Sequence, residues 1–406
     1  MTEPLITPQR RGFRAPGTTF MVTGGLIGAV GAYLFQVYGT RSLDPDAFAP
    51  VSVLWTAFFI LATILLVPVE QYVTREVASG RKTLPDDLKP SLLMAGIGAL
   101  VGGGFVWVTL DDLFAGDPVY VAQIVLLMVG YSLLFTGKGV LAGSRRFAGV
   151  GWVLIVETLA RLVAGVVLLQ FVLSAASLGW AMVIGGFSVL VLGWWRHDKG
   201  ERQAGPASPG KFLTGYVGGT SSSQLLLAGA PLAVAALGGS AALISILFVT
   251  FTLYRAPLTL IFALQGRILP YLVGLSRDAD HTQLVRITRG VVLGGAVLAG
   301  LGAVVGWFVG PEVVGFLYGE QYTPTDVVAM FAAGGVMAAA AAQIASQVLV
   351  AEGRTSRLSW AWLGGLLVAL VVLVVARGEA DTRVALAFAV GEVVALGLMA
   401  ALAMRR

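Results

Sequence analysis

The longest polar interval in the chain is RHDKGERQAGPASPGK, residues 196–211, which separates two long series of apolar stretches. Its content of Pro, Ser and Gly is typical of flexible linkers. Six apolar stretches precede it and six follow it. The sequence therefore predicts a cytoplasmic N-terminal tail (1–17), an N-terminal six-helix lobe (18–195), a cytoplasmic linker (196–211) and a C-terminal six-helix lobe (212–406). Because an even number of spans precedes the linker, both halves enter the membrane in the same orientation, as parallel repeats do.

The composition is that of an integral membrane protein. Of the 406 residues, 57% are hydrophobic and 12% are charged, which is about half the charged share of soluble proteins. About 20 apolar residues are needed to cross a bilayer core of about 30 Å. The sequence therefore predicts an all-α polytopic membrane protein with about twelve transmembrane helices. These are expected at 18–38, 49–70, 90–110, 118–140, 148–172, 175–195, 212–236, 241–266, 287–309, 325–350, 358–376 and 384–403.

The positions of Lys and Arg predict how the chain is oriented. If the N-terminus is cytoplasmic, 22 of the 27 basic residues fall in cytoplasmic segments. The others are Arg41, Arg377 and Arg383 in outer loops, and Arg161 and Arg255 within spans. This bias follows the positive-inside rule, so we expect a multi-pass protein of the plasma (inner) membrane with both termini cytoplasmic. The net positive charge is explained by this topology, and nucleic-acid binding is not needed to explain it.

A trace of internal repetition supports the division into halves. Residues 142–145 (AGSR) follow the fourth predicted span, and Trp152 comes soon after them. Residues 351–354 (AEGR) follow the tenth span, and Trp360 comes after them in the same way. Both segments occupy the corresponding loop of each half.

Several kinds of catalytic or cofactor site are excluded. The chain has no cysteine, which removes disulfides, thiolate nucleophiles and Cys-based metal sites. Its two histidines, His197 and His281, lie in polar stretches without metal-binding spacing. Residues 137–139 (GKG) lack the preceding glycine and following Ser or Thr of a phosphate-binding loop, since Ser132 stands at the glycine position. We therefore expect no catalytic residues, no metal, no cofactor and no enzymatic activity.

Glycine is abundant, with 53 residues in the chain. Gly24 and Gly28 are four residues apart in the first span. This spacing predicts a face of small residues at which two helices approach closely, rather than a nucleotide fingerprint.

The charges inside spans are the main candidates for function, because each costs about 2.5–3.5 kcal/mol at the centre of a helix on the insertion scale. Glu157 and Arg161 have the i, i+4 spacing that favours an ion pair, so a structural pair and a cavity role both stay open. Glu392 has no cation one turn away on its own helix, and is a proton or cation site or a buried protonated carboxyl. Arg255 has no acidic partner on its own helix and is the best candidate for substrate contact, with a structural pair to another helix as the alternative. Pro257 follows it and can kink the helix beside it.

Three segments carry a resemblance to a known family. They are 41–48 (RSLDPDAF), similar to the family's turn between the first two spans; 319–324 (GEQYTP), similar to its outer loop before span ten; and 343–354 (QIASQVLVAEGR), similar to its exit from span ten. By these segments and the six-plus-six plan, the chain resembles the polysaccharide biosynthesis and oligosaccharide flippase family. That family is part of the multidrug, oligosaccharidyl-lipid and polysaccharide exporter superfamily.

The resemblance implies two six-helix lobes around a central cavity that opens alternately to either side of the membrane. The implied substrate is a polyprenyl-pyrophosphate-linked glycan, with Arg161 and Arg255, one per lobe, binding its anionic head and Glu157 and Glu392 as candidates for ion coupling. The lipid tail is expected to stay in the bilayer between the lobes. Glycosyltransferases or a glycan polymerase are the possible protein partners.

Two other classes of function stay open. A cation-coupled multidrug antiporter of the same superfamily would need acidic residues in the N-terminal lobe, and Glu157 is the one deeply placed acid there. A non-transporting membrane scaffold or a membrane-bound glycan polymerase is the other class. A polymerase would be expected to have a large polar outer loop, and the predicted outer loops are all short.

Overall fold

The computed structural model describes residues 17–78, 84–193, 221–277 and 281–404. The chain is nearly all helical, about 90%, and no strand occurs in these ranges. Eleven helices among the described residues are long and apolar enough to cross a membrane. The prediction of an all-α polytopic membrane protein is therefore confirmed.

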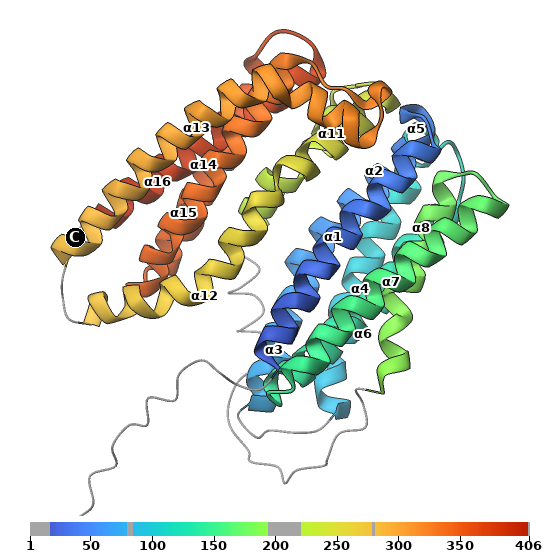
Figure 1. Ribbon diagram of the computed structural model, residues 1–406, viewed down its shortest axis with the longest axis horizontal. Helices are drawn as coiled ribbons and strands as arrows, with labels where there is room; N and C mark the ends of the chain where they lie inside the picture. The colour runs from blue at the N-terminus through green and yellow to red at the C-terminus, as the bar shows by residue number, and fades with distance from the viewer. Residues whose placement is uncertain (1–16, 79–83, 194–220, 278–280, 405–406) are drawn as a thin grey trace, which may run out of the picture.

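The helices form two bundles that follow each other in the sequence (Figure 1). The first contains α1 (Thr18–Ser42), α2 (Pro45–Leu61), a π-helical turn (Ala62–Leu66), α3 (Val67–Ala78), α4 (Leu84–Val108), α5 (Leu110–Leu113), α6 (Val119–Gly143), α7 (Phe147–Phe171), α8 (Ala175–Phe187) and a 3-10 turn (Ser188–Leu192). The second contains α10 (Ala230–Ala236), α11 (Ala241–Tyr254), α12 (Ala256–Arg277), α13 (His281–Tyr318), a 3-10 turn (Glu320–Tyr322), α14 (Asp326–Ala351), α15 (Thr355–Val375) and α16 (Ala380–Met404). The predicted linker, 196–211, and nearly all of the predicted tail, 1–17, lie outside the described residues.

Three predicted spans differ from the observed helices. The seventh, 212–236, begins outside the described residues, and its described part is a helix over 221–228 followed by α10. The eighth, 241–266, is interrupted at Arg255, between α11 and α12, where the expected effect of Pro257 is observed. The ninth, 287–309, is part of the longer α13, because hydropathy marks the apolar section and not the end of the hydrogen-bonded helix.

Side chains that cap helix starts explain several of the boundaries. The Asp44 carboxylate accepts a hydrogen bond from the Ala47 amide at 2.8 Å, and Pro45 begins α2. Ser240 and Thr325 cap α11 and α14 in the same manner. Each cap satisfies an amide that has no partner within its own helix, which fixes where the helix begins.

The predicted repeat forms the same turn in both bundles. The equivalent residues in the first bundle lie one position later than the alignment of 142–145 with 351–354 predicts. The Arg146 amide donates to the Leu141 carbonyl at 2.8 Å, and the Arg354 amide donates to the Leu349 carbonyl at 2.8 Å. The residue before each arginine has a positive φ, 58° in the first turn and 71° in the second. Arg146 therefore corresponds to Arg354, and this offset also aligns Trp152 with Trp360.

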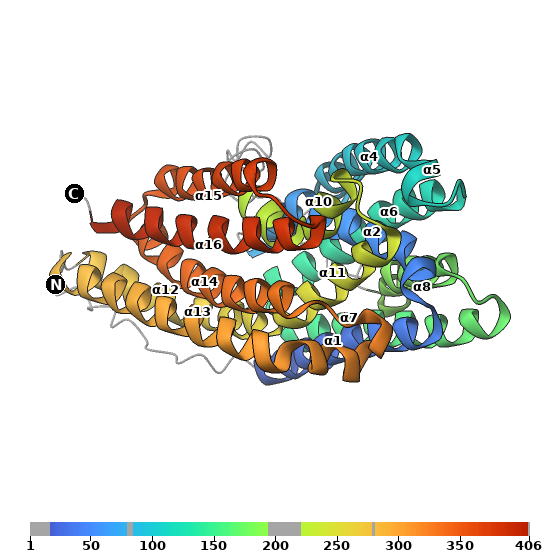
Figure 2. The ribbon, with the colours of Figure 1, turned by 90° about the horizontal axis from the view of Figure 1, so that it is seen from above.

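The two bundles approach each other at the end near α5 and α11 and diverge toward the end where α3 and α12 lie (Figures 1 and 2). Hydrogen bonds between the bundles occur at the first of these ends. The Tyr322 hydroxyl donates to the Leu43 carbonyl at 2.8 Å, the Ser245 hydroxyl donates to the Pro45 carbonyl at 2.6 Å, and Arg41 donates to backbone carbonyls of α13. Burial raises the pKa of the Tyr322 hydroxyl, which keeps it a donor at neutral pH. Most of these residues lie in the predicted outer loops, and Ser245 lies near the start of the predicted eighth span.

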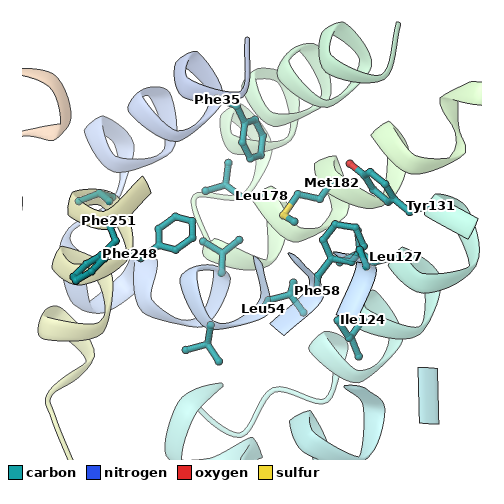
Figure 3. Close-up of a cluster of buried hydrophobic side chains, with 14 of the residues drawn as sticks. Phe35, Leu54, Phe58, Ile124, Leu127, Tyr131, Leu178, Met182, Phe248 and Phe251 are labelled. Atoms are coloured by element: carbon teal, nitrogen blue, oxygen red, sulfur yellow. The ribbon is translucent and has the colours of Figure 1, made fainter. Parts of the chain in front are cut away.

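A shared apolar core lies behind these contacts. Phe248 of α11 extends toward the side chains of α2, and the core continues through Leu54 and Phe58 into the first bundle (Figure 3). The ring centroids of Trp55 and Phe248 are 5.7 Å apart, a distance typical of favourable aromatic pairs. The bundles are therefore packed together at one end through side chains as well as hydrogen bonds.

The predicted small-residue face of the first span is confirmed where α1 crosses α7. A Cβ placed on Gly24 would lie 2.7 Å from the Gly151 backbone, and a Cβ on Gly28 would lie 3.5 Å from the Thr158 hydroxyl. Glycine at position 24 is therefore required by the closeness of the two backbones.

This close approach predicts the effect of added volume. Replacing Gly24 by Val should destabilise the protein by roughly 1–3 kcal/mol, because the backbones of α1 and α7 must separate. The melting temperature of the purified protein in detergent measures this loss. Gly104→Val is the control, because nothing lies within 4 Å of a Cβ at that position. Equal melting temperatures for the two variants would contradict the packing described here.

Candidate functional site

A cavity of about 260 Å³ lies between the two bundles, next to the end at which they meet. The lining residues are Ala29, Ala32, Tyr33, Gln36, Trp55, Thr56 and Phe59 from the first bundle, and Ala228, Pro231, Phe248, Thr252, Arg255 and Leu258 from the second. Both halves therefore contribute to one central cavity. Its walls are mainly apolar and aromatic, as is usual for small-molecule sites, with a few polar groups.

Arg255 is the one charged side chain among these lining residues. It is the residue after α11, at the break before α12, so it extends from a helix end rather than from a continuous helix. Its Nε is buried and has no hydrogen-bond partner among the described residues. Its guanidinium lies 6.0 Å from the centroid of the Phe251 ring. The cavity therefore holds a cation whose hydrogen-bonding capacity is not fully used.

Polar residues around Arg255 come from both bundles. The Tyr33 hydroxyl on α1 donates to the Thr252 carbonyl on α11 at 3.1 Å. Gln36, one turn further along α1, has a buried side-chain oxygen without a hydrogen-bond partner in the described chain. Neither Tyr33 nor Gln36 is among the site residues predicted from the sequence. The i, i+3 spacing of these two polar residues within an apolar span is the signal that would have identified them.

Glu392 lies behind the cavity wall and not in it. It is fully buried on α16, and neither carboxylate oxygen has a hydrogen-bond partner among the residues that the structure describes. It interacts electrostatically with Arg255. One turn earlier on each helix, Phe388 and Phe251 pack edge to face with ring centroids 5.0 Å apart. The two helices therefore place Arg255 and Glu392 at matching positions, without a direct ion pair.

Glu157 and Arg161 form a hydrogen-bonded network inside the first bundle, in which the Arg161 Nε is a buried donor without a partner among the described residues. Their charged atoms are 3.1 Å apart. The Tyr131 hydroxyl donates to Glu157 Oε1 at 2.6 Å, and the Thr158 hydroxyl donates to Glu157 Oε2 at 3.0 Å. Arg161 also lies over the Trp55 ring, 5.4 Å from its centroid. Both carboxylate oxygens are satisfied, as a buried ion pair requires.

The structure thus separates the four predicted site residues into two pairs. Arg255 lines the central cavity, and Glu392 lies on the neighbouring helix outside that lining, each one turn after a member of the Phe251–Phe388 pair. Glu157 and Arg161 are paired within the first bundle, and Arg161 is separated from the cavity by the lining residue Trp55. The two arginines do not line one cavity together in this conformation.

Among comparisons with known proteins, those with solved structures identify the fold. No family model matches the chain. The uncharacterized protein Rv3630 of Mycobacterium tuberculosis is 26% identical, over 93% of this chain and 89% of that protein. A multidrug resistance MATE family transporter of the MOP superfamily in its inward-facing conformation matches with a TM-score of 0.70 and 11% identity, over 95% of this chain and 97% of that chain.

Two further solved structures are similar. An outward-facing multidrug resistance MATE family transporter of the MOP superfamily has a TM-score of 0.54 and 14% identity, over 96% of this chain and 95% of that chain. A MOP superfamily transporter from Pyrococcus furiosus, described as having a binding pocket of reverse polarity that suggests a different function, has a TM-score of 0.65 and 12% identity, over 96% of this chain and 93% of that chain. The chain therefore has the fold of the MATE transporters of the MOP superfamily.

The hydrogen-bonded network in the first bundle predicts a structural effect. Glu157→Gln leaves Arg161 buried without its carboxylate and should cost roughly 3–5 kcal/mol of stability. The double variant Glu157→Leu/Arg161→Leu removes both charges and should recover much of this loss. Melting temperatures of the purified variants measure both effects. A single Gln variant as stable as the original protein would refute the structural role of the pair.

Proposed function

We propose that this protein is a membrane transporter that moves a lipid-linked oligosaccharide or polysaccharide precursor to the outer leaflet by alternating access. The observation that carries the proposal is the cavity's charge, because Arg255 is the one charged residue among its described lining. A guanidinium can donate paired hydrogen bonds to phosphate oxygens, and its planar fork suits a pyrophosphate better than an ammonium does. An anionic, pyrophosphate-linked lipid is therefore the substrate class that fits the cavity.

The free-energy cost of a cation within a span supports an anionic ligand for the cavity. A cation within a span costs about 2.5–3.5 kcal/mol on the insertion scale, and it is compensated by an anion that enters the cavity. Glu392 compensates Arg255 only partly, because the two are not in direct contact. A bound pyrophosphate would supply the missing hydrogen-bond acceptors for the guanidinium, including the buried Nε.

Two observations support alternating access. The TM-score is higher for the inward-facing MATE transporter, 0.70, than for the outward-facing one, 0.54. The Tyr322–Leu43 and Ser245–Pro45 hydrogen bonds between the bundles lie at the end that the positive-inside rule assigns to the outer side. In this proposal both termini are cytoplasmic, the protein lies in the plasma membrane, and the cavity is reached from the cytoplasm.

The membrane potential can drive such a step. Moving one negative charge out of a cell whose interior is at −100 mV releases about 2.3 kcal/mol of free energy. An anionic head carried outward therefore moves in the favourable direction without nucleotide hydrolysis. Use of the glycan by a polymerase or another enzyme outside would maintain the gradient, and such enzymes are the proposed partners.

A cation-coupled multidrug antiporter is the second candidate, because the similar solved structures include multidrug transporters. The charges of this chain favour the first candidate. Glu157, the acid predicted within a span of the first bundle, is engaged with Arg161, Tyr131 and Thr158, and the described cavity lining contains no acid. The reverse polarity described for the Pyrococcus furiosus transporter is a precedent for a different substrate charge on this fold.

Substitution of Arg255 tests the proposal. Arg255→Gln should lower the rate at which a pyrophosphate-linked isoprenoid crosses proteoliposomes by about 30-fold or more, because losing one partner of a buried charged contact costs roughly 2 kcal/mol or more. Arg255→Lys should restore little of it, since an ammonium cannot make the paired contact. Arg289→Gln, at an exposed position of α13, is the matched control. Normal transport by a stably expressed Arg255→Gln variant would refute the proposed substrate contact.

Substitution of Glu392 tests ion coupling separately. Glu392→Gln keeps the shape of the side chain and removes its titratable proton. If protons are exchanged at this position during transport, the original protein should show a pH-dependent rate and the Gln variant should lose that dependence. Glu312→Gln, at an exposed position of α13, is the control. An unchanged rate and pH profile for Glu392→Gln would leave this carboxyl with a structural role.

A further inference from the structure

The corner between α1 and α2, residues 41–46 (RSLDPD), lies where the two bundles meet. This is the end near α5 and α11, which the positive-inside rule assigns to the outer side and which we call the outer end (Figure 1). Hydroxyl groups of the second bundle donate to two backbone carbonyls of the corner, those of Leu43 and Pro45. Two charged side chains of the corner, Arg41 and Asp46, instead contact helix ends of the second bundle.

Asp46 lies between the N-termini of two helices. It is in the first turn of α2, and its carboxylate accepts a hydrogen bond at 3.0 Å from the Ala242 amide in the first turn of α11. The two helix starts are packed together, since the ring centroids of Phe48 and Phe248 are 6.2 Å apart. The N-terminus of a helix carries a partial positive charge, so two N-termini side by side repel each other. One carboxylate therefore compensates both ends.

Arg41 has the complementary position between two C-termini. It is in the last turn of α1, and its guanidinium donates from Nε to the Leu317 carbonyl at 3.2 Å and from Nη2 to the Phe316 carbonyl. α13 ends at Tyr318, so both carbonyls are among the last four, which have no partner within an α-helix. Helix C-termini carry a partial negative charge. One guanidinium therefore compensates the ends of α1 and α13.

Both charges act across the contact between the bundles. α1 and α2 belong to the first bundle, whereas α11 and α13 belong to the second. While the outer ends of the bundles are together, each charge compensates two helix ends. After separation, each charge would compensate only the end of its own helix. The electrostatic free energy therefore favours the arrangement in which the outer end is closed.

We propose that Arg41 and Asp46 form an electrostatic latch that holds the outer end closed and must be broken whenever the central cavity opens outward. This inference rests on the alternating access of the proposed function and does not depend on the charge of the substrate. Both side chains are exposed, so ions in the outer medium weaken their contacts. The ionic strength outside therefore regulates how readily the cavity opens to that side.

The distance between the outer ends of the bundles measures the state of the latch. The chain has no cysteine, so spin labels can be attached to Leu173→Cys and Val375→Cys in the full-length protein in nanodiscs. Leu173 is 65% exposed between α7 and α8, and Val375 is 71% exposed at the end of α15. By double electron–electron resonance, Arg41→Gln and Asp46→Asn should each raise the ratio of open to closed molecules about two- to fivefold.

Two substitutions within the second bundle are matched controls. Asp326 is an exposed acid in the first turn of α14, and Arg383 donates to the Leu373 carbonyl in the last turn of α15 at 2.5 Å. These side chains resemble the latch residues in chemistry, but the helix ends beside them belong to their own bundle. Asp326→Asn and Arg383→Gln should therefore leave the ratio of open to closed molecules unchanged.

Exchanging the two charges distinguishes the latch from a direct ion pair. Arg41→Asp/Asp46→Arg places an acid at two C-termini and a base at two N-termini, so it should open the outer end more than either single substitution. An ion pair between the two side chains would be restored by the exchange. Raising NaCl from about 0.1 M to about 1 M shortens the Debye length from about 10 Å to about 3 Å. This change should open the original protein, but not Arg41→Gln/Asp46→Asn.

The outcomes separate the latch from the proposed function. An exchange variant that is as closed as the original protein would overturn the latch, and so would single variants with the same distance distribution as the original protein. Failure of the proposed function has a different result. If the latch variants open the outer end, yet the original protein moves no pyrophosphate-linked isoprenoid, the latch is supported and the proposed substrate is wrong.

Discussion

The site depends on one constraint, which is a guanidinium inside a membrane-embedded cavity that has no direct ionic partner among the residues that the structure describes. Arg255 is held there by the end of α11, where Pro257 prevents the helix from continuing regularly. A charge at this depth is costly and persists only if something compensates it. Glu392 on the neighbouring helix reduces the cost, and an anion in the cavity would reduce it further. The polar groups from the first bundle and the contact between the bundles are arranged around this position.

Arg161 shows what a compensated arginine looks like in the same molecule. It has Glu157 at 3.1 Å, and that carboxylate is also satisfied by Tyr131 and Thr158. Such a pair stabilises one arrangement of helices, although the Arg161 Nε, like the Arg255 Nε, has no partner among the described residues. The two arginines, one per half, therefore have different environments, and only the second is exposed to the central cavity in this conformation.

Much of the fold could be predicted from the sequence, because burial in lipid leaves a strong signal in composition. Spans, short loops and the small-residue face of Gly24 and Gly28 follow from apolarity and from small residues, whereas the partner of that face, Gly151, does not. The i, i+4 pairing of Glu157 with Arg161 was also predictable, since it depends on one helix only. The contacts between helices were not. Nothing in the letters indicates that Tyr131 reaches Glu157, or that Phe388 and Phe251 place Glu392 beside Arg255. The alignment of the repeated turn was also wrong by one residue. Sequence letters pair Arg145 with Arg354, whereas the backbone hydrogen bonds pair Arg146 with Arg354.

In the proposed function, the positive charge of the cavity selects an anionic lipid head. The most direct measurement uses the purified, unmodified protein in proteoliposomes that carry an inside-negative potential. The movement of a fluorescent pyrophosphate-linked isoprenoid between leaflets is followed beside the movement of a cationic dye. We expect the protein to accelerate the movement of the isoprenoid, the acceleration to grow with the potential, and the dye not to be moved. Transport of the dye in exchange for protons or sodium ions, with no acceleration of the isoprenoid, would contradict the proposed function.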